Sequence, residues 1–272
     1  MRLRQNPVVA ISVATFIDGY RDRLIQGLLI VGVFFVLSTA VFSSFSMRQP
    51  MEVAINYGLS VVQILATILT LFLGLNLISR ELESKAGHPV LAQPISRGSY
   101  IIGKFMGLLM IVLVILIISG ACAALGIWLT TLTLDTPGHV SWAGFIIALY
   151  GTFISCTVLG GLTVLFTSLS TSAILPFLLT CGVYAIGQST QAAKRFIEAE
   201  LAGVELTPLV KMIAKGAYYI FPNFALFDFK VQAIYDLPES ATLLGIATVY
   251  GLTYLALTLF GAVILFEKRD LS

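Results

Sequence analysis

The chain has 272 residues, of which 58% are hydrophobic and 11% are charged, and its formal net charge is +2. Soluble domains carry about 25% charged residues, so a chain with this composition has too little polar surface for a water-soluble globule. The small net charge, spread between apolar runs, gives no indication of a nucleic-acid partner. The sequence therefore predicts an all-α, polytopic membrane protein with one domain over residues 1–272.

An amphipathic stretch near the N-terminus precedes the first long apolar run. Its apolar residues on one helical face are Val8, Ile11, Phe16, Ile17 and Tyr20. The stretch is broken by Asp18 and bounded by the charged residues 21–23, which makes a poor cleavable signal peptide. This pattern predicts an interfacial helix over residues 7–23, lying along the membrane before the first span.

Six transmembrane helices are predicted, because a helix needs about 20 apolar residues to cross a hydrocarbon core. Four spans are Leu24–Phe45, Val53–Ile78, Phe105–Thr130 and Thr242–Phe266, and two more lie within Pro137–Ala193. That last range has no charged residue and is too long for one crossing, so a turn is predicted at 168–172.

Residues 191–240, between the fifth and sixth spans, mix charged and apolar residues. They are predicted to form a small helical extracytoplasmic segment. Its aromatic stretch, 218–224, is predicted to lie at the membrane interface, where aromatic side chains are enriched.

The basic residues predict the orientation. With six spans, the following basic residues fall on the same side of the membrane: Arg2, Arg4, Arg21, Arg23, Arg80, Lys85, Arg97, Lys104, Lys268 and Arg269. Basic residues near span ends favour the cytoplasm. Both termini and residues 80–104 are therefore predicted to be cytoplasmic, in a plasma membrane of the bacterial inner-membrane type.

The predicted spans contain no ionisable side chain of the kind that ion-coupled carriers use. Polar uncharged residues do occur, and Gln63, Thr67 and Thr70 share one side of the second span, together with Asn56. Two interpretations stay open: hydrogen bonds between packed helices, or the lining of a translocation path.

Nothing in the chain predicts an enzyme or a resident cofactor or metal. The three cysteines lie in apolar runs without metal-ligand spacing. The stretch 98–105 resembles a P-loop but has Phe105 where the hydroxyl ligand of Mg²⁺ is needed, and it leads directly into a span.

The charged stretch between the second and third spans carries a family resemblance. The segments that match the family best are Arg80–Lys85, Pro89–Gly98 and Tyr100–Lys104. Weaker matches are Phe221–Phe224, Phe227 and Phe266–Asp270. With these segments the chain resembles an ABC type-2 transporter permease, and more narrowly the NosY-like branch associated with multicopper-enzyme maturation.

The resemblance implies a separate cytoplasmic ABC ATPase subunit, which holds the ATP and Mg, and a second permease copy as in a homodimer. It also implies that Glu81, Glu83, Arg97 and Lys104 dock that ATPase. Independently of the family, alternating charges and two prolines suit residues 80–104 to act as a stiff cytoplasmic coupling loop. The sequence departs from the family at 86–88, where Gly87 costs about 1 kcal/mol of helix stability relative to Ala.

The leading hypothesis is a permease subunit that couples ATP hydrolysis by the separate ATPase to export or extraction of an unidentified substrate. One alternative is an ATP-independent secondary transporter, which the charge-free spans disfavour. The other is a non-transporting maturation factor or scaffold, in which residues 191–240 recruit an extracytoplasmic partner. Membrane lipid surrounds the protein in every case.

Overall fold

A computed structural model describes residues 6–46, 49–83, 96–133, 140–170, 172, 174–200, 212, 216, 218–236 and 241–268. Within these ranges the chain forms helices joined by short connections, and no strand. The prediction of an all-α membrane protein is confirmed. The central part of the predicted coupling loop, 84–95, lies outside the described residues.

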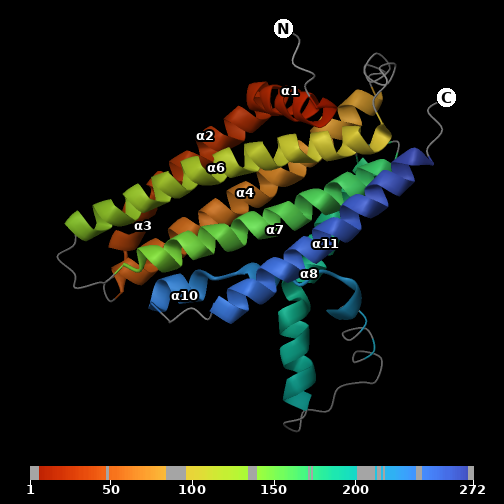
Figure 1. Ribbon diagram of the computed structural model, residues 1–272. Helices are drawn as coiled ribbons and strands as arrows, with labels where there is room; N and C mark the ends of the chain where they lie inside the picture. The colour runs from red at the N-terminus through yellow and green to blue at the C-terminus, as the bar shows by residue number, and fades with distance from the viewer. Residues whose placement is uncertain are drawn as a thin grey trace.

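The long helices form an elongated bundle. The elements in chain order are α1 Pro7–Arg21, α2 Arg23–Leu37, α3 Thr39–Ser44, α4 Pro50–Glu83, α6 Arg97–Thr133, α7 Trp142–Leu169, α8 Ile174–Glu200, η1 Phe224–Phe227, α10 Lys230–Tyr235 and α11 Ala241–Glu267. Figure 1 shows α4, α6, α7 and α11 running side by side, with α1 beside one end of α6 and the far half of α8 projecting from the bundle.

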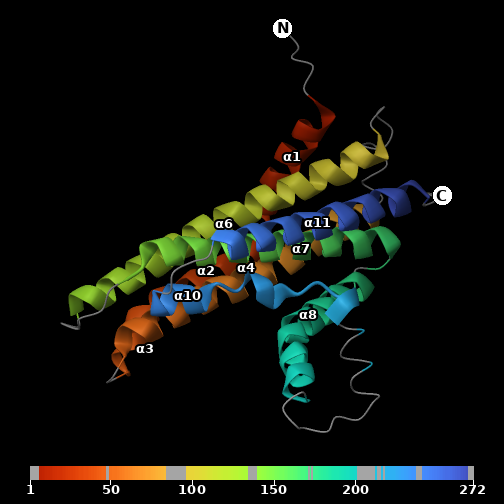
Figure 2. The ribbon, with the colours of Figure 1, turned by 60° about the horizontal axis from the view of Figure 1, so that its bottom comes forward.

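Five of the described helical segments are long and apolar enough to cross a membrane: 25–44, 50–76, 97–132, 142–169 and 241–267. The predicted turn at 168–172 is present, because α7 ends at Leu169 and α8 begins at Ile174. The fifth predicted span, the second within Pro137–Ala193, corresponds to α8, which is not among these five segments. Its first half is apolar, but Gln188 and Gln191 follow, and the helix continues into charged residues. Figure 2 shows that α8 changes direction partway and leaves the bundle.

The helices on either side of the predicted coupling loop extend beyond the predicted spans, Val53–Ile78 and Phe105–Thr130. α4 continues to Glu83, and α6 begins at Arg97. The ends of these two helices and the C-terminal end of α11 lie at the same end of the bundle (Figure 1). A force that acts on the connection between α4 and α6 would therefore be transmitted to two long, continuous helices.

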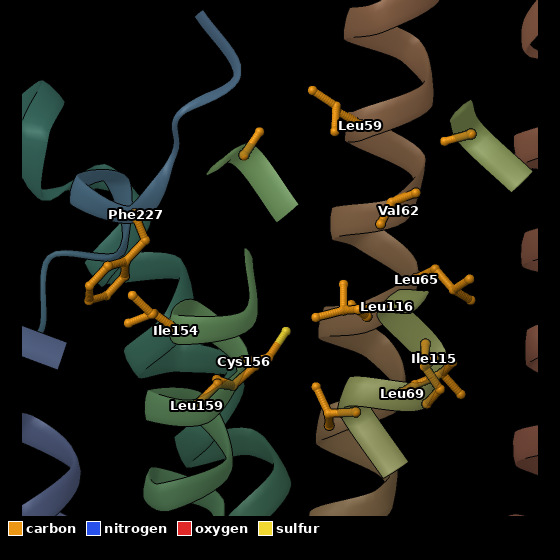
Figure 3. Close-up of a cluster of buried hydrophobic side chains, with 14 of the residues drawn as sticks. Leu59, Val62, Leu65, Leu69, Ile115, Leu116, Ile154, Cys156, Leu159 and Phe227 are labelled. Carbon is orange, nitrogen blue, oxygen red and sulfur yellow. The ribbon is translucent and has the colours of Figure 1, made fainter. Parts of the chain in front are cut away.

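The core lies between α4, α6 and α7. Figure 3 shows Leu59, Val62, Leu65 and Leu69 of α4 in this cluster with residues of α6 and α7. Close approach of the helices depends on small residues, as is common in membrane bundles. A Cβ atom at Gly74 of α4 would lie 2.7 Å from the Cγ2 atom of Thr163 on α7.

The helix predicted over 7–23 is α1, and it packs on α6. Ile11, Ser12, Thr15 and Gly19 are its buried residues. A Cβ atom at Gly103 of α6 would lie 2.8 Å from the Cβ atom of Ile11, and the Ser12 hydroxyl donates a hydrogen bond to the Gly103 carbonyl at 3.1 Å. α1 is thus fixed to the part of α6 that carries the predicted docking residues.

The aromatic stretch after α8 differs from its prediction. Tyr219 is exposed, as an interface residue would be, but Phe224, Phe227 and Phe229 are buried. The ring of Phe224 lies 5.0 Å from that of Tyr184 on α8, measured between centroids. The assignment of Phe224 to an interface belt was wrong, because η1 folds back into the bundle and its aromatic rings fill the space beside α7, α8 and α11.

Candidate functional site

Five polar residues lie along one face of α4. They are Asn56, Ser60, Gln63, Thr67 and Thr70, and we call them the α4 stripe. Their spacing alternates between four and three residues, which keeps side chains on one side of a helix. Burial increases along the stripe, from the exposed Asn56 to the fully buried Thr70.

A charged pair on α10 and its preceding turn meets the outer part of the α4 stripe. The ammonium of Lys230 donates a hydrogen bond to the Ser60 hydroxyl at 3.4 Å and lies 3.5 Å from a carboxylate oxygen of Asp228. Ser60 in turn donates to the side-chain oxygen of Asn56 at 3.4 Å. The polar face of α4 is therefore linked to the segment between the last two long helices.

The inner part of the α4 stripe contacts α7 and α8. The hydroxyls of Thr67 and Tyr184 are 3.4 Å apart, and Gln188 donates to the Tyr184 hydroxyl at 2.9 Å. The thiol of Cys156 on α7 lies near the hydroxyls of Thr67 and Thr70. Thr70 also donates to the Ala66 carbonyl of its own helix at 2.7 Å.

These contacts place two of the predicted path residues inside the packed bundle. Thr67 is 7% exposed and Thr70 is fully buried, whereas Gln63 is half-buried. In this arrangement the Thr67 hydroxyl lies within hydrogen-bond distance of Tyr184 on α8, whereas the Thr70 hydroxyl bonds within its own helix. A role for them in lining a path requires α4 to separate from α7 and α8.

The second candidate region joins the start of α6 to the end of α11. It consists of Arg97, Tyr100, Lys104 and Phe266, and we call it the α6–α11 junction. One guanidinium nitrogen of Arg97 donates to the carbonyls of Phe266 at 3.2 Å and Glu267 at 3.1 Å. A cation at the C-terminus of a helix satisfies its terminal carbonyls and interacts favourably with its dipole.

Lys104 is buried in the same junction, at 6% exposure. Its ammonium lies 5.7 Å from the centroid of the Tyr100 ring, a cation–π distance. Ile11 of α1 and Val164 of α7 belong to the same buried cluster as Tyr100 and Phe266. The junction thus joins the ends of four helices.

The structure brings together two of the four predicted docking residues, Arg97 and Lys104. Glu81 and Glu83 lie in the last turn of α4, and their side chains are outside the described residues. The contacts that the sequence did not predict are those of Tyr184 and Lys230 with the α4 stripe. Two features of the sequence could have pointed to these contacts. One is the spacing of Tyr184 and Gln188 by one helical turn, and the other is the pair of opposite charges at 228 and 230.

No group of three His, Cys, Asp or Glu residues suited to a metal ion occurs within the described ranges.

Long apolar helices around a buried core define the class, a polytopic helical membrane protein. Residues 10–271 match the family model described as ABC-2 family transporter protein. The match covers nearly the whole chain, and the chain belongs to the ABC-2 transporter family. No curated protein matches the sequence.

Proposed function

We propose that this chain is the permease subunit of an ATP-driven transporter, worked by a separate cytoplasmic ABC ATPase. The ATPase supplies ATP hydrolysis and holds the Mg, and the chain itself has no catalytic role. Membership of the ABC-2 family supports the proposal, since permeases of this family work in general with such a partner. We further propose the NosY-like branch, a second permease copy, the inner membrane, and export or extraction as the direction.

The observation that carries the coupling proposal is the α6–α11 junction. Arg97 is the first residue of α6 and directly follows the predicted coupling loop, and its side chain holds the end of α11. Stacking of Tyr100 on Phe266 ties the same two helices one turn further on. A push on the loop would therefore move α6 and α11 together instead of bending one helix.

Within this proposal the four docking residues have different tasks. Glu81 and Glu83, at the end of α4, are the direct contacts to the ATPase. Arg97 is held by α11 and Lys104 is buried, so these two act by fixing the position of the docking segment. The end of the bundle that carries them, with both termini, faces the cytoplasm.

The proposed translocation path follows the α4 stripe. Gln63 is half-buried in this arrangement, and Thr67 and Thr70 become part of the path when α4 and α7 separate. Asn56, Ser60 and Lys230 lie near the extracytoplasmic end of this path. The segment around η1 and α10 is the natural place for an extracytoplasmic partner, because its residues link α4, α7 and α11.

Docking is tested by affinity purification of the permease co-expressed with its ABC ATPase. The double variant Glu81→Lys, Glu83→Lys is compared with Glu52→Lys, which reverses a charge in the first turn of the same helix at its other end. We expect the double variant to recover about tenfold less ATPase, because it reverses the charge of both residues proposed to contact the partner. Equal recovery, or uptake by vesicles that contain the permease without nucleotide, would overturn the proposal.

A further inference from the structure

An apolar cavity lies where α1 and α2 meet, around Asp22, and it faces α6. We call the region around this helix junction the elbow. The volume of the cavity is about 270 Å³, and it is bounded by Phe16 of α1, Leu29 of α2 and Ile111, Ile115 and Ile118 of α6. Apolar cavities of about 150 Å³ bind molecules the size of benzene, so this one has room for a longer hydrocarbon segment. Only Tyr20 and Gln26 bring polar groups to its lining.

The elbow around the cavity is held open by specific contacts. The Gln26 amide of α2 donates a hydrogen bond to the Tyr20 carbonyl of α1 at 2.9 Å. Gly19 lies directly against Ile111, where a Cβ atom would clash with the Ile111 side chain. Asp22, in extended conformation, separates the two helices. α1 is therefore anchored to α6 at Gly19, α2 packs on α6 near Gly126, and the cavity lies between the three helices.

Two arginines lie between the end of α1 and the apolar segment of α2. The apolar segment 25–44 begins two residues after Arg23, and both Arg21 and Arg23 are exposed. Arginine at the end of a span lies in the headgroup region, where its guanidinium can bind phosphate with two parallel hydrogen bonds. The cavity itself is bounded mainly by the apolar side chains of three helices, as an acyl chain requires.

We propose that this elbow is a binding site for one anionic phospholipid. Its acyl chain occupies the cavity between α1, α2 and α6, and Arg21 and Arg23 bind its phosphate. Asp18 and Asp22 lie beside the two arginines and balance their formal charge. The preference for an anionic over a zwitterionic headgroup is therefore expected to be a few-fold and to depend on the two guanidinium groups.

The experiment uses the full chain in phosphatidylcholine vesicles with a trace of phosphatidylglycerol that carries a photoreactive group on its acyl chain. Labelled positions are identified by peptide mass spectrometry. We expect labelling concentrated at Phe16, Leu29 and Ile111–Ile118, and competition by unlabelled phosphatidylglycerol a few-fold stronger than by phosphatidylcholine. Labelling spread evenly over all exposed helix faces would show ordinary surrounding lipid and overturn the proposal.

Two variants test the binding of the headgroup and the binding of the acyl chain separately. The double variant Arg21→Gln, Arg23→Gln should lose the few-fold preference, whereas Lys268→Gln, an exposed basic residue at the end of α11, should keep it. Ile118→Trp fills the cavity and should abolish labelling there, with size-exclusion chromatography confirming that it folds. An unchanged preference in the arginine variant overturns the headgroup assignment. Crosslinks from the elbow to a second permease copy in place of lipid overturn the site altogether.

Discussion

The ring of Tyr100 stacks on the ring of Phe266, with centroids 5.8 Å apart and an angle of 15° between the ring planes. The two residues belong to α6 and α11, which are far apart in the sequence. Arg97 holds the last carbonyls of α11 beside this stack, and the ammonium of Lys104 lies 5.7 Å from the centroid of the Tyr100 ring. Two hydrogen bonds and one ring stack therefore bind the end of α11 to the segment of α6 that follows the predicted coupling loop.

Replacing Arg97 by Gln should loosen the end of α11. The guanidinium provides two hydrogen bonds and a positive charge at the helix C-terminus, and Gln keeps hydrogen-bonding capacity without the charge. We expect a loss of about 1 kcal/mol in the free energy of unfolding, measured by denaturant titration in detergent. Lys268→Gln removes an exposed charge near the same helix end and should change stability much less. Equal effects of the two variants would contradict a specific role for Arg97.

The sequence was sufficient to predict the long spans because their apolar runs are uninterrupted and bounded by charges. It was not sufficient for α8 and the segment after it. The uncharged residues from 174 to Ala193 read as a span, but the polar residues from Gln188 onward end the apolar stretch within the same helix. η1 enters the bundle because its aromatic residues fit against Gly151, Gly187 and Gly251, a complementarity between distant segments that no local pattern reveals.

The α4 stripe was predictable in part. The spacing of Gln63, Thr67 and Thr70 places them on one face, as the structure shows. Their partners could not be predicted, because the contact of Thr67 with Tyr184 depends on how α4 and α8 pack. Lys104 likewise resembles a surface charge in the sequence. It is buried at 6% exposure in the part of the bundle where α6 packs on α1 and α11.

Close packing of α4 on α7 makes Gly74 intolerant of a side chain. A Cβ atom there would lie 2.7 Å from the Cγ2 atom and 2.9 Å from the Cβ atom of Thr163, whose branched side chain has little freedom to move. We expect Gly74→Ala to destabilise the protein by about 1–3 kcal/mol, as overpacking does. The measurement is the midpoint of thermal unfolding in detergent.

The matched control for that prediction is Gly245→Ala on α11, where a Cβ atom would meet nothing within 4 Å. Alanine has a higher helix propensity than glycine, by about 0.8–1.0 kcal/mol, so this variant should be neutral or slightly stabilised. A stabilising effect of Gly74→Ala would show that α4 and α7 are not packed as described.

The burial of η1 can be tested by comparing two aromatic residues close in sequence. Phe224 is 1% exposed and packs on Tyr184, whereas Tyr219 is 78% exposed. We expect Phe224→Ala to cost about 3–5 kcal/mol, because it leaves a cavity between η1 and α8. Tyr219→Ala should change the unfolding midpoint little. Similar small effects at both positions would place the whole stretch at the membrane interface and remove η1 from the core.

Separation of α4 from α7 during transport is tested by the reactivity of a cysteine placed at Thr70. The natural residues Cys122, Cys156 and Cys181 are first replaced by alanine, and a membrane-impermeant thiol reagent is added from outside. Thr70 is fully buried, so Thr70→Cys should stay unlabelled without nucleotide. If the α4 stripe lines the path, labelling should appear when the ATPase and ATP are present. Leu69→Cys, equally buried in the core, should stay unlabelled in both conditions. Labelling of neither residue while the ATPase is active would leave Thr70 with a packing role only.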